Sequence, residues 1–281
     1  DRQQRIVEAS RDDARKPRWW PLWRIARTLL LAYLIILLLA MLFEHRLIFQ
    51  ALKYPAGDWE PRGLTVEDAH FTAADGTKLH GWHVPHDNPL AHVLFLHGNA
   101  GNVTHRIDIL RDLHRIGAEV LILDYRGYGK SEGKPNEQGV LEDARAARKW
   151  LAERAGIAES DIVLLGRSLG GGVAVDLTTD VTPRALVLES TFTNMPDVAA
   201  VHYPFLPVRW AMNTRLDSQS KIVNYYGPLL QSHGTIDYVI PYEFGKQLFE
   251  ACPSPDKRFM TIERGGHNDY QPREYCAALQ E

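Results

Sequence analysis

The sequence predicts an α/β fold, a mostly parallel sheet with helices on both faces, preceded by one apolar helix. From about Leu64 onward, short apolar runs typical of buried strands alternate with amphipathic runs typical of helices. Ahead of them, residues 29–43 (LLLAYLIILLLAMLF) contain no charged residue, glycine or proline. The composition, 45% hydrophobic and 24% charged residues, is that of a folded protein, and a net charge of −3 gives no reason to expect a nucleic-acid partner.

The apolar run predicts a transmembrane anchor over residues 22–43. The run alone is shorter than the roughly 20 residues that cross a bilayer as a helix. The preceding residues lengthen it, because Arg24 and Arg27 can extend their charged ends to the headgroups. A cleaved signal peptide is the main alternative, but no small-residue cleavage site follows the run. A buried core helix would show a polar face, and this run has none.

Charge on either side of the anchor predicts its orientation. Residues 1–27 hold eight Lys or Arg against four acids, and residues 44–53 hold two against one. The positive-inside rule then predicts a cytoplasmic basic segment over residues 1–21 and a single-pass protein whose main domain lies on the outer side. We expect residues 44–63 to form a linker and residues 64–281 to form that domain.

The domain's elements follow one another as strands and helices. Residues 66–84 predict a hairpin that turns at Asp75-Gly76. Buried strands are expected at 92–98, 119–125, 161–166, 185–190, 227–234 and 258–263; helices are expected at 106–116, 137–154, 170–178 and 241–251, and a short helix closes the chain.

Residues 166–170 read Gly-Arg-Ser-Leu-Gly, the G-x-S-x-G pattern of a nucleophile on a sharp strand-to-helix turn. The pattern follows an apolar strand and opens a helix, which is the context that this chemistry needs. Small residues on either side of Ser168 let the strand and helix approach closely. A phosphate-binding loop is excluded on spacing, because Gly129-Lys130-Ser131 has Asp124 where the first glycine of that motif should stand.

A serine nucleophile needs a base within hydrogen-bond reach, oriented in turn by an acid. In this architecture the chain order is Ser, acid, His, with each residue just after a strand. Asp237 in the segment SHGTIDYVIP and His267 in ERGGHNDY satisfy both conditions. Asp269 is a rival acid, but it lies only two residues from His267 and is poorly placed to reach the far side of the ring.

Two backbone N–H groups must stabilise the oxyanion of the tetrahedral intermediate. One belongs to Leu169, the residue after the nucleophile. The second is expected from the loop His97–Asn102 (HGNAGN), with the Asn99 N–H preferred and the Ala100 N–H as the alternative.

No metal site is expected. His80, His83 and His86 are three residues apart on a strand and cannot converge on one ion, so solvent exposure is the favoured interpretation. Cys252 and Cys276 have no zinc-ligand spacing. A disulfide between them stays open, although two separate thiols are favoured.

Six segments together resemble the α/β-hydrolase superfamily: LFLHGNAGN, LILDYRGYGKSEGKPNEQGVLEDA, LLGRSLGGGVA, LVLESTFTN, HGTIDYVIP and GGHND. More narrowly, the chain is similar to membrane-anchored abhydrolase-domain serine hydrolases, a group that includes lysophospholipid and monoacylglycerol lipases and protein depalmitoylases. The resemblance covers about residues 64–281 and implies a sheet of about eight strands. It implies a triad of Ser168, Asp237 and His267, and no cofactor.

The resemblance also assigns two further segments. In the relatives, the segment DYRGYGKSEG is a structural loop beside the active site, and Asp124 and Arg126 are expected to pair within it. The resemblance also implies a small lid over residues 192–226, too short for more than one or two helices, and ordinary packing over the sheet edge is the alternative.

The resemblance implies a membrane-anchored enzyme that cleaves acyl esters of lysophospholipid or glyceride type, with an acyl-chain lipid as substrate and the membrane as partner. An acyl-protein thioesterase is the alternative, and a peptidase ranks third because no propeller or large gating domain is expected. A non-catalytic membrane-tethered scaffold on the same fold would have a broken triad or a blocked turn, and the sequence keeps both intact.

Overall fold

The structure, a computed structural model, describes residues 20–280 and divides into two compact units, Asp1–Phe43 and Glu44–Glu281. In the first unit, helix α2 (Trp20–Leu42) contains the span Leu22–Leu42, which is long and apolar enough to cross a membrane. Its large apolar side chains are exposed. All but the last two residues of the expected basic segment, 1–21, lie outside the described residues.

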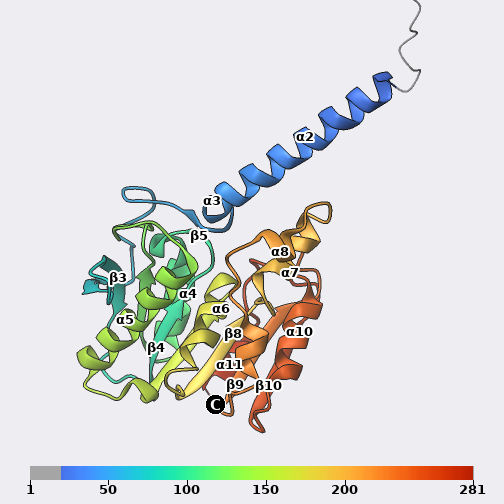
Figure 1. The fold of residues 1–281 in the computed structure, drawn as a ribbon. Coiled ribbons are helices and arrows are strands. Elements are labelled where there is room, and N and C mark those ends of the chain that lie inside the picture. Colours follow the sequence, from blue (N-terminus) through green and yellow to red (C-terminus); the bar gives the residue numbers. More distant parts are fainter. Residues whose placement is uncertain (1–19, 281) are drawn as a thin grey trace, which may run out of the picture. The chain divides into compact units, whose positions relative to one another are not determined.

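The second unit is built on an eight-stranded sheet (Figure 1). Its strands are β2 (Glu67–Thr72), β3 (Lys78–Val84), β4 (Ala91–Leu96), β6 (Ala118–Asp124), β7 (Ile162–Arg167), β8 (Ala185–Glu189), β9 (Leu229–Gly234) and β10 (Lys257–Ile262). They lie in the order β10-β9-β8-β7-β4-β6-β3-β2. Within this sheet β3 runs in the direction opposite to the other seven strands, so the mostly parallel sheet is confirmed. The hairpin β2–β3 turns at Asp75-Gly76, where Gly76 has a φ of 88°.

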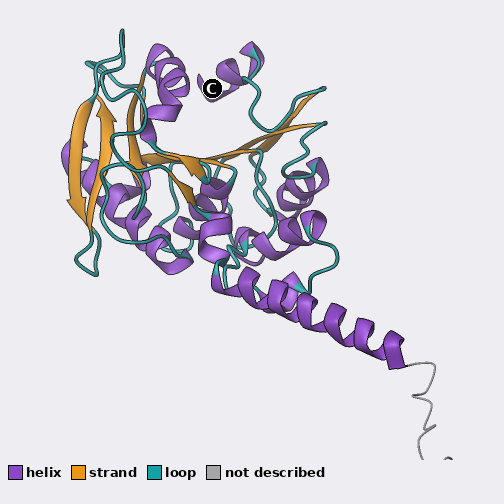
Figure 2. Ribbon diagram, turned by 90° about the horizontal axis from the view of Figure 1, so that it is seen from above, coloured by secondary structure: helices purple, strands orange, loops and turns teal. Residues whose placement is uncertain are grey.

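Helices cover both faces of the sheet (Figure 2), which explains why the strands are continuously apolar. Along β6, Leu121 and Leu123 pack into one core and Val120 and Ile122 into the other, because successive side chains point to opposite faces. The first core takes side chains from α5 (Glu137–Ala155), α6 (Leu169–Leu177) and α10 (Tyr242–Ala251), and the second from α4 (Ile107–Arg115) and α11 (Arg273–Gln280). Two short 3₁₀ helices, η1 (Val103–Arg106) and η2 (Glu159–Asp161), complete the set.

Residues 44–63, expected to be a linker, belong to the compact second unit. They contain α3 (Glu44–Ile48) and β1 (Gln50–Ala51), and β1 pairs in parallel with β5 (Ala100–Gly101). The buried Glu44 carboxylate accepts hydrogen bonds from the N–H groups of Asn213 (3.0 Å) and Thr214 (2.6 Å). The segment that follows α2 in the chain is therefore an integral part of the domain.

The expected lid, residues 192–226, forms three short helices rather than one or two. They are α7 (Met195–His202), α8 (Val208–Ala211) and α9 (Ser218–Ile222). Phe205, between α7 and α8, is 87% exposed, and Trp210, on α8, is 89% exposed. The prolines at 204 and 207 keep the helices short, because proline lacks the N–H that an inner helical turn requires.

The expected ion pair between Asp124 and Arg126 is wrong. Asp124 accepts from the Val103 N–H (3.0 Å) and contacts His80 Nδ1 (2.9 Å). The Arg126 guanidinium instead donates to Asp143 of α5 (2.8 Å). Arg126 lies two residues beyond the end of β6, where the alternation of strand side chains no longer applies, and its partner comes from α5.

The expected exposure of His80 and His83 is also wrong, since both are 1% exposed. The His80 ring lies 2.9 Å from both Asp68 and Asp124, and the two nitrogens of His83 lie 3.2 Å and 3.0 Å from Glu67 and Glu119. No group of three metal-ligating side chains occurs among residues 20–280. Cys252 and Cys276 are both free thiols.

Candidate active site

Ser168 stands on a sharp turn between β7 and α6. Its backbone has a φ of 54° and a ψ of −121°, a conformation that is rare for any residue with a side chain. The Ser168 N–H donates to the carbonyl of Glu189 (2.9 Å), and the Ser168 carbonyl accepts from the Thr191 hydroxyl (2.9 Å). Hydrogen bonds on both sides of the residue therefore stabilise the strained turn.

The glycines around Ser168 are required by close approach. A side chain at Gly170 would overlap the carbonyl of Leu96 on β4, and a Cβ at Gly166 would lie 2.5 Å from the Gly170 carbonyl oxygen. A Cβ at Gly171 would likewise overlap the side chain of Thr191. The extra glycine after the G-x-S-x-G pattern thus lets α6 lie directly against the strand ends.

The structure brings the three predicted side chains into a line. His267 Nε2 lies 3.0 Å from Ser168 Oγ, and His267 Nδ1 lies 2.7 Å from Asp237 Oδ2. Ser168 follows β7, Asp237 follows β9 and His267 follows β10, so three parallel strands supply them at the carboxyl edge of the sheet, with β8 between β7 and β9.

The electrostatics of Asp237 determine which nitrogen of His267 carries the proton. Burial opposes ionisation of Asp237, but hydrogen bonds from the rings of His233 and His267 outweigh it and hold the pKa of the carboxyl well below its usual range. The N–H groups of Val239 (2.9 Å) and Ile240 (2.8 Å) also donate to it. An ionised carboxylate only accepts, so Nδ1 of His267 carries the proton and Nε2 accepts from the Ser168 hydroxyl.

The rival acid does not contact His267 Nδ1. Asp269 is exposed and accepts a hydrogen bond from the Gly266 N–H (2.8 Å). It therefore closes the turn that carries His267 and lies outside the line of three side chains.

The two predicted oxyanion donors flank Ser168. Leu169 opens α6, and its N–H has no protein acceptor in the described chain. Gly98 lies against Ser168 so closely that a Cβ there would stand 3.3 Å from the Ser168 Cβ, and Asn99 follows it. The Asn99 N–H likewise has no acceptor among residues 20–280.

Residues that the sequence analysis missed hold Asn99 in place. The Asn99 carbonyl accepts from the Tyr128 hydroxyl (2.7 Å) and from the Gln50 N–H (3.1 Å), and its side-chain amide donates to the Ile48 carbonyl (3.0 Å). Tyr128 belongs to the loop expected to be structural. Ile48 and Gln50 carry no motif, and only the pairing of β1 with β5 reveals their role.

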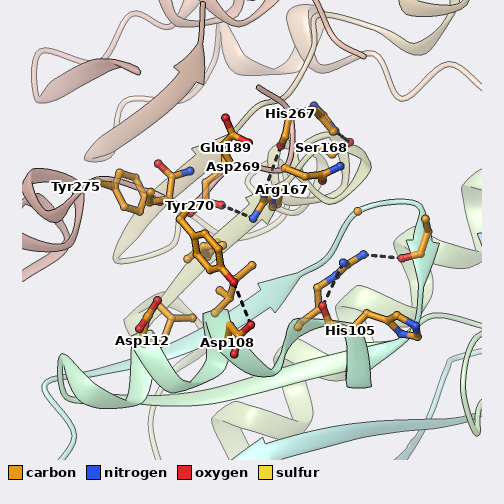
Figure 3. Close-up of a pocket in the computed structure, with 18 of the residues that line it drawn as sticks. His105, Asp108, Asp112, Arg167, Ser168, Glu189, His267, Asp269, Tyr270 and Tyr275 are labelled. Atoms are coloured by element: carbon orange, nitrogen blue, oxygen red, sulfur yellow. Dashed lines mark hydrogen bonds and ion pairs between the residues drawn. The ribbon is translucent and has the colours of Figure 1, made fainter. Parts of the chain in front are cut away.

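A cavity of about 560 Å³ opens beside Ser168 and His267. Arg106, Arg167, Glu189 and Tyr275 also line it, and Figure 3 shows the last three around Ser168. The volume lies within the range of small-molecule pockets, so a substrate of modest size fits beside the nucleophile.

Comparison with known proteins identifies the family of the chain. The family model described as serine aminopeptidase, S33, matches residues 87–222. An uncharacterized protein of Mycobacterium tuberculosis is 37% identical, over 80% of this chain and 81% of its own. The α/β hydrolase domain-containing protein WAV2 of Arabidopsis thaliana is 34% identical, over 73% of each chain. The structure of a Pyrococcus furiosus esterase superposes with a TM-score of 0.68 at 21% identity, over 83% of this chain and 96% of its own, which shows a shared fold. The chain belongs to the α/β-hydrolase superfamily.

Proposed function

We propose that this protein is a serine hydrolase that cleaves acyl esters through a covalent acyl-enzyme. The observation that carries the proposal is the continuous hydrogen-bonded line from Ser168 Oγ through His267 to Asp237, at 3.0 Å and 2.7 Å. Nucleophile, base and orienting acid stand in the order and geometry that acyl transfer needs. The cavity beside Ser168 gives the ester access.

The reaction follows from the positions of these groups. Ser168 Oγ attacks the ester carbonyl carbon while His267 Nε2 takes the hydroxyl proton. The negative charge on the former carbonyl oxygen is stabilised by the N–H groups of Leu169 and Asn99. The alcohol leaves with the proton from His267, and a water molecule, activated by the same nitrogen, releases the acid. Asp237 stays ionised and stabilises the imidazolium.

The substrate class and location belong to the same proposal. The lid exposes Phe205 and Trp210, and α2 is long and apolar enough to cross a membrane. We propose that α2 anchors the chain with its N-terminus in the cytoplasm and its domain on the outer side, and that acyl chains come from the bilayer. Lysophospholipid or glyceride esters are the leading substrates, with thioesters as the alternative.

Fluorophosphonate labelling tests for an activated serine. The full chain in detergent should be labelled, and Ser168→Ala should lose the label, because the Ser168 hydroxyl can pass its proton to the His267 ring. A panel of acyl esters, acyl thioesters and an aminoacyl anilide then gives the bond that is cleaved. A folded wild-type protein that takes no label would contradict the proposal and favour a non-catalytic scaffold.

A matched pair of variants tests the assignment of the acid. Asp237→Asn should lower kcat by about 10³- to 10⁴-fold, because the amide can donate to Nδ1 and stabilise the wrong tautomer of His267. Asp269→Asn is the control, with less than about a threefold effect expected, since Asp269 does not touch the His267 ring. Steady-state kinetics on one soluble ester gives both values, and equal losses would show that the acid is wrongly assigned.

Lid variants test the delivery of acyl chains. Phe205→Ser combined with Trp210→Ser should lower kcat/KM on long-chain esters in vesicles by about tenfold, and spare short soluble esters, because the two rings supply apolar area for a bilayer or an acyl chain. Leu90→Ser is the matched control. Leu90 is also exposed, but it precedes the amino end of β4, whereas the triad lies at the carboxyl ends of the strands. Equal losses on long and short esters would rule out this role of the lid.

A further inference from the structure

The cavity beside Ser168 contains two arginine side chains that the proposed reaction does not use. Arg167 immediately precedes the nucleophile, and Arg106 is the last residue of η1, shortly after the oxyanion loop. Cations in an active-site cavity are costly unless something balances their charge. The partners of each arginine therefore show which of the two has an adjacent counter-charge.

Arg167 is balanced within the protein. Its Nη2 donates to the His267 carbonyl (3.1 Å), and its Nη1 lies 3.9 Å from the Glu189 carboxylate (Figure 3). Both side chains are nearly buried, and the Tyr275 hydroxyl donates to the other oxygen of Glu189 (2.5 Å). The charge of Arg167 thus has an adjacent counter-charge.

Arg106 has no such partner. Its guanidinium donates to two neutral acceptors, the carbonyls of Ala100 (2.5 Å) and His105 (3.4 Å). Its Nε is buried and has no hydrogen-bond partner, and no carboxylate lies within 4.0 Å in the part of the chain that the structure describes. The nearby acids on α4, Asp108 and Asp112, pair with other arginines.

The groups packed around Arg106 do not supply a negative charge. Burial, and then the charge of Arg106, lower the pKa of His97 to about 4, so that ring is neutral. Burial raises the pKa of the Tyr128 hydroxyl, which also stays neutral. Burial, and then the charge of Arg167, lower the pKa of Arg106 itself to about 10, which leaves it protonated at neutral pH. Arg106 therefore carries a positive charge with no adjacent counter-charge, although the cavity lining also includes the carboxylates of Asp108, Asp112, Glu189 and Asp269.

We propose that Arg106 binds a phosphate group of the substrate while Ser168 attacks the substrate's acyl ester. The inference rests on the proposed hydrolase function and makes it more specific: the preferred substrates are acyl esters of a phosphorylated alcohol rather than neutral acylglycerols. A guanidinium offers paired N–H donors that match phosphate oxygens. In an acyl glycerol phosphate the ester and the phosphate are separated by only three carbons. Ser168 and Arg106 both line the cavity of about 560 Å³.

Arg106 has a competing structural role, which the test must separate. Its bond to the Ala100 carbonyl fixes the strand β5 beside Asn99. Loss of that bond alone would lower activity on every ester by the same factor, whereas loss of a phosphate ligand would act on phosphorylated substrates selectively. The informative quantity is therefore the ratio of kcat/KM between two substrates that differ only in the phosphate.

The first experiment measures that ratio for 1-acylglycerol 3-phosphate against the 1-acylglycerol with the same chain, using the full protein in detergent. In Arg106→Gln the ratio should fall by about 10- to 100-fold, the usual cost of a hydrogen bond to a charged group. Arg106→Lys should recover part of it. Lys149→Gln, which removes an exposed charge from α5, should keep the wild-type ratio. An unchanged ratio in Arg106→Gln would overturn the proposal.

The second experiment does not depend on catalysis. Calorimetric titration of full-length Ser168→Ala with glycerol 3-phosphate should show binding that disappears in the Ser168→Ala, Arg106→Gln double variant. Inorganic phosphate should bind more weakly than glycerol 3-phosphate. Absence of binding, or equal binding to both variants, would overturn the phosphate site even if the esterase is active. Inorganic phosphate that binds as tightly as glycerol 3-phosphate would overturn the assignment of the site to a substrate group.

Discussion

The backbone turn at Ser168 is the constraint on which the rest of the site depends. A residue with a side chain at a φ of 54° costs on the order of 1–3 kcal/mol and persists only where its surroundings stabilise it. Here the Ser168 peptide groups bond to β8 and Thr191, and glycines let α6 contact β4 without overlap. The same turn presents Oγ to His267 and places the Leu169 N–H at the start of a helix. The proposed nucleophile and the proposed oxyanion donor therefore both depend on one strained residue.

The second half of the site depends on a segment that follows α2 in the chain. Residues 48–50 hydrogen-bond to Asn99, and Glu44 accepts from the backbone at Asn213 and Thr214, where the lid returns toward α9. The oxyanion loop and the lid are therefore both attached to the chain just after the apolar helix. Arg106 completes this arrangement, because it bonds to the strand beside Asn99 and lines the cavity. The proposed phosphate ligand, Arg106, and the proposed oxyanion donor, Asn99, therefore lie on one short stretch of the chain.

Much of this could be predicted because the signals are local. The strands β4, β6, β7 and β8 are largely apolar runs, and Ser168, Asp237 and His267 each lie just after a strand. What could not be predicted depends on register between distant segments. The partners of His80 and His83 come from both neighbouring strands. Arg126 donates to Asp143 of α5, 17 residues further along the chain. Residues 48–50 have no pattern of their own, since a two-residue strand has no periodicity to detect.

The central claim is that Ser168 carries the acyl group during turnover, and trapping that intermediate tests it most directly. The full protein would be mixed with a p-nitrophenyl ester, quenched in acid within milliseconds, digested and analysed by mass spectrometry. The account predicts one added acyl group, on the peptide that contains Ser168, formed together with a burst of p-nitrophenol and lost at the turnover rate. Ester hydrolysis with no acyl group on that peptide, or with the group on another residue, would contradict it.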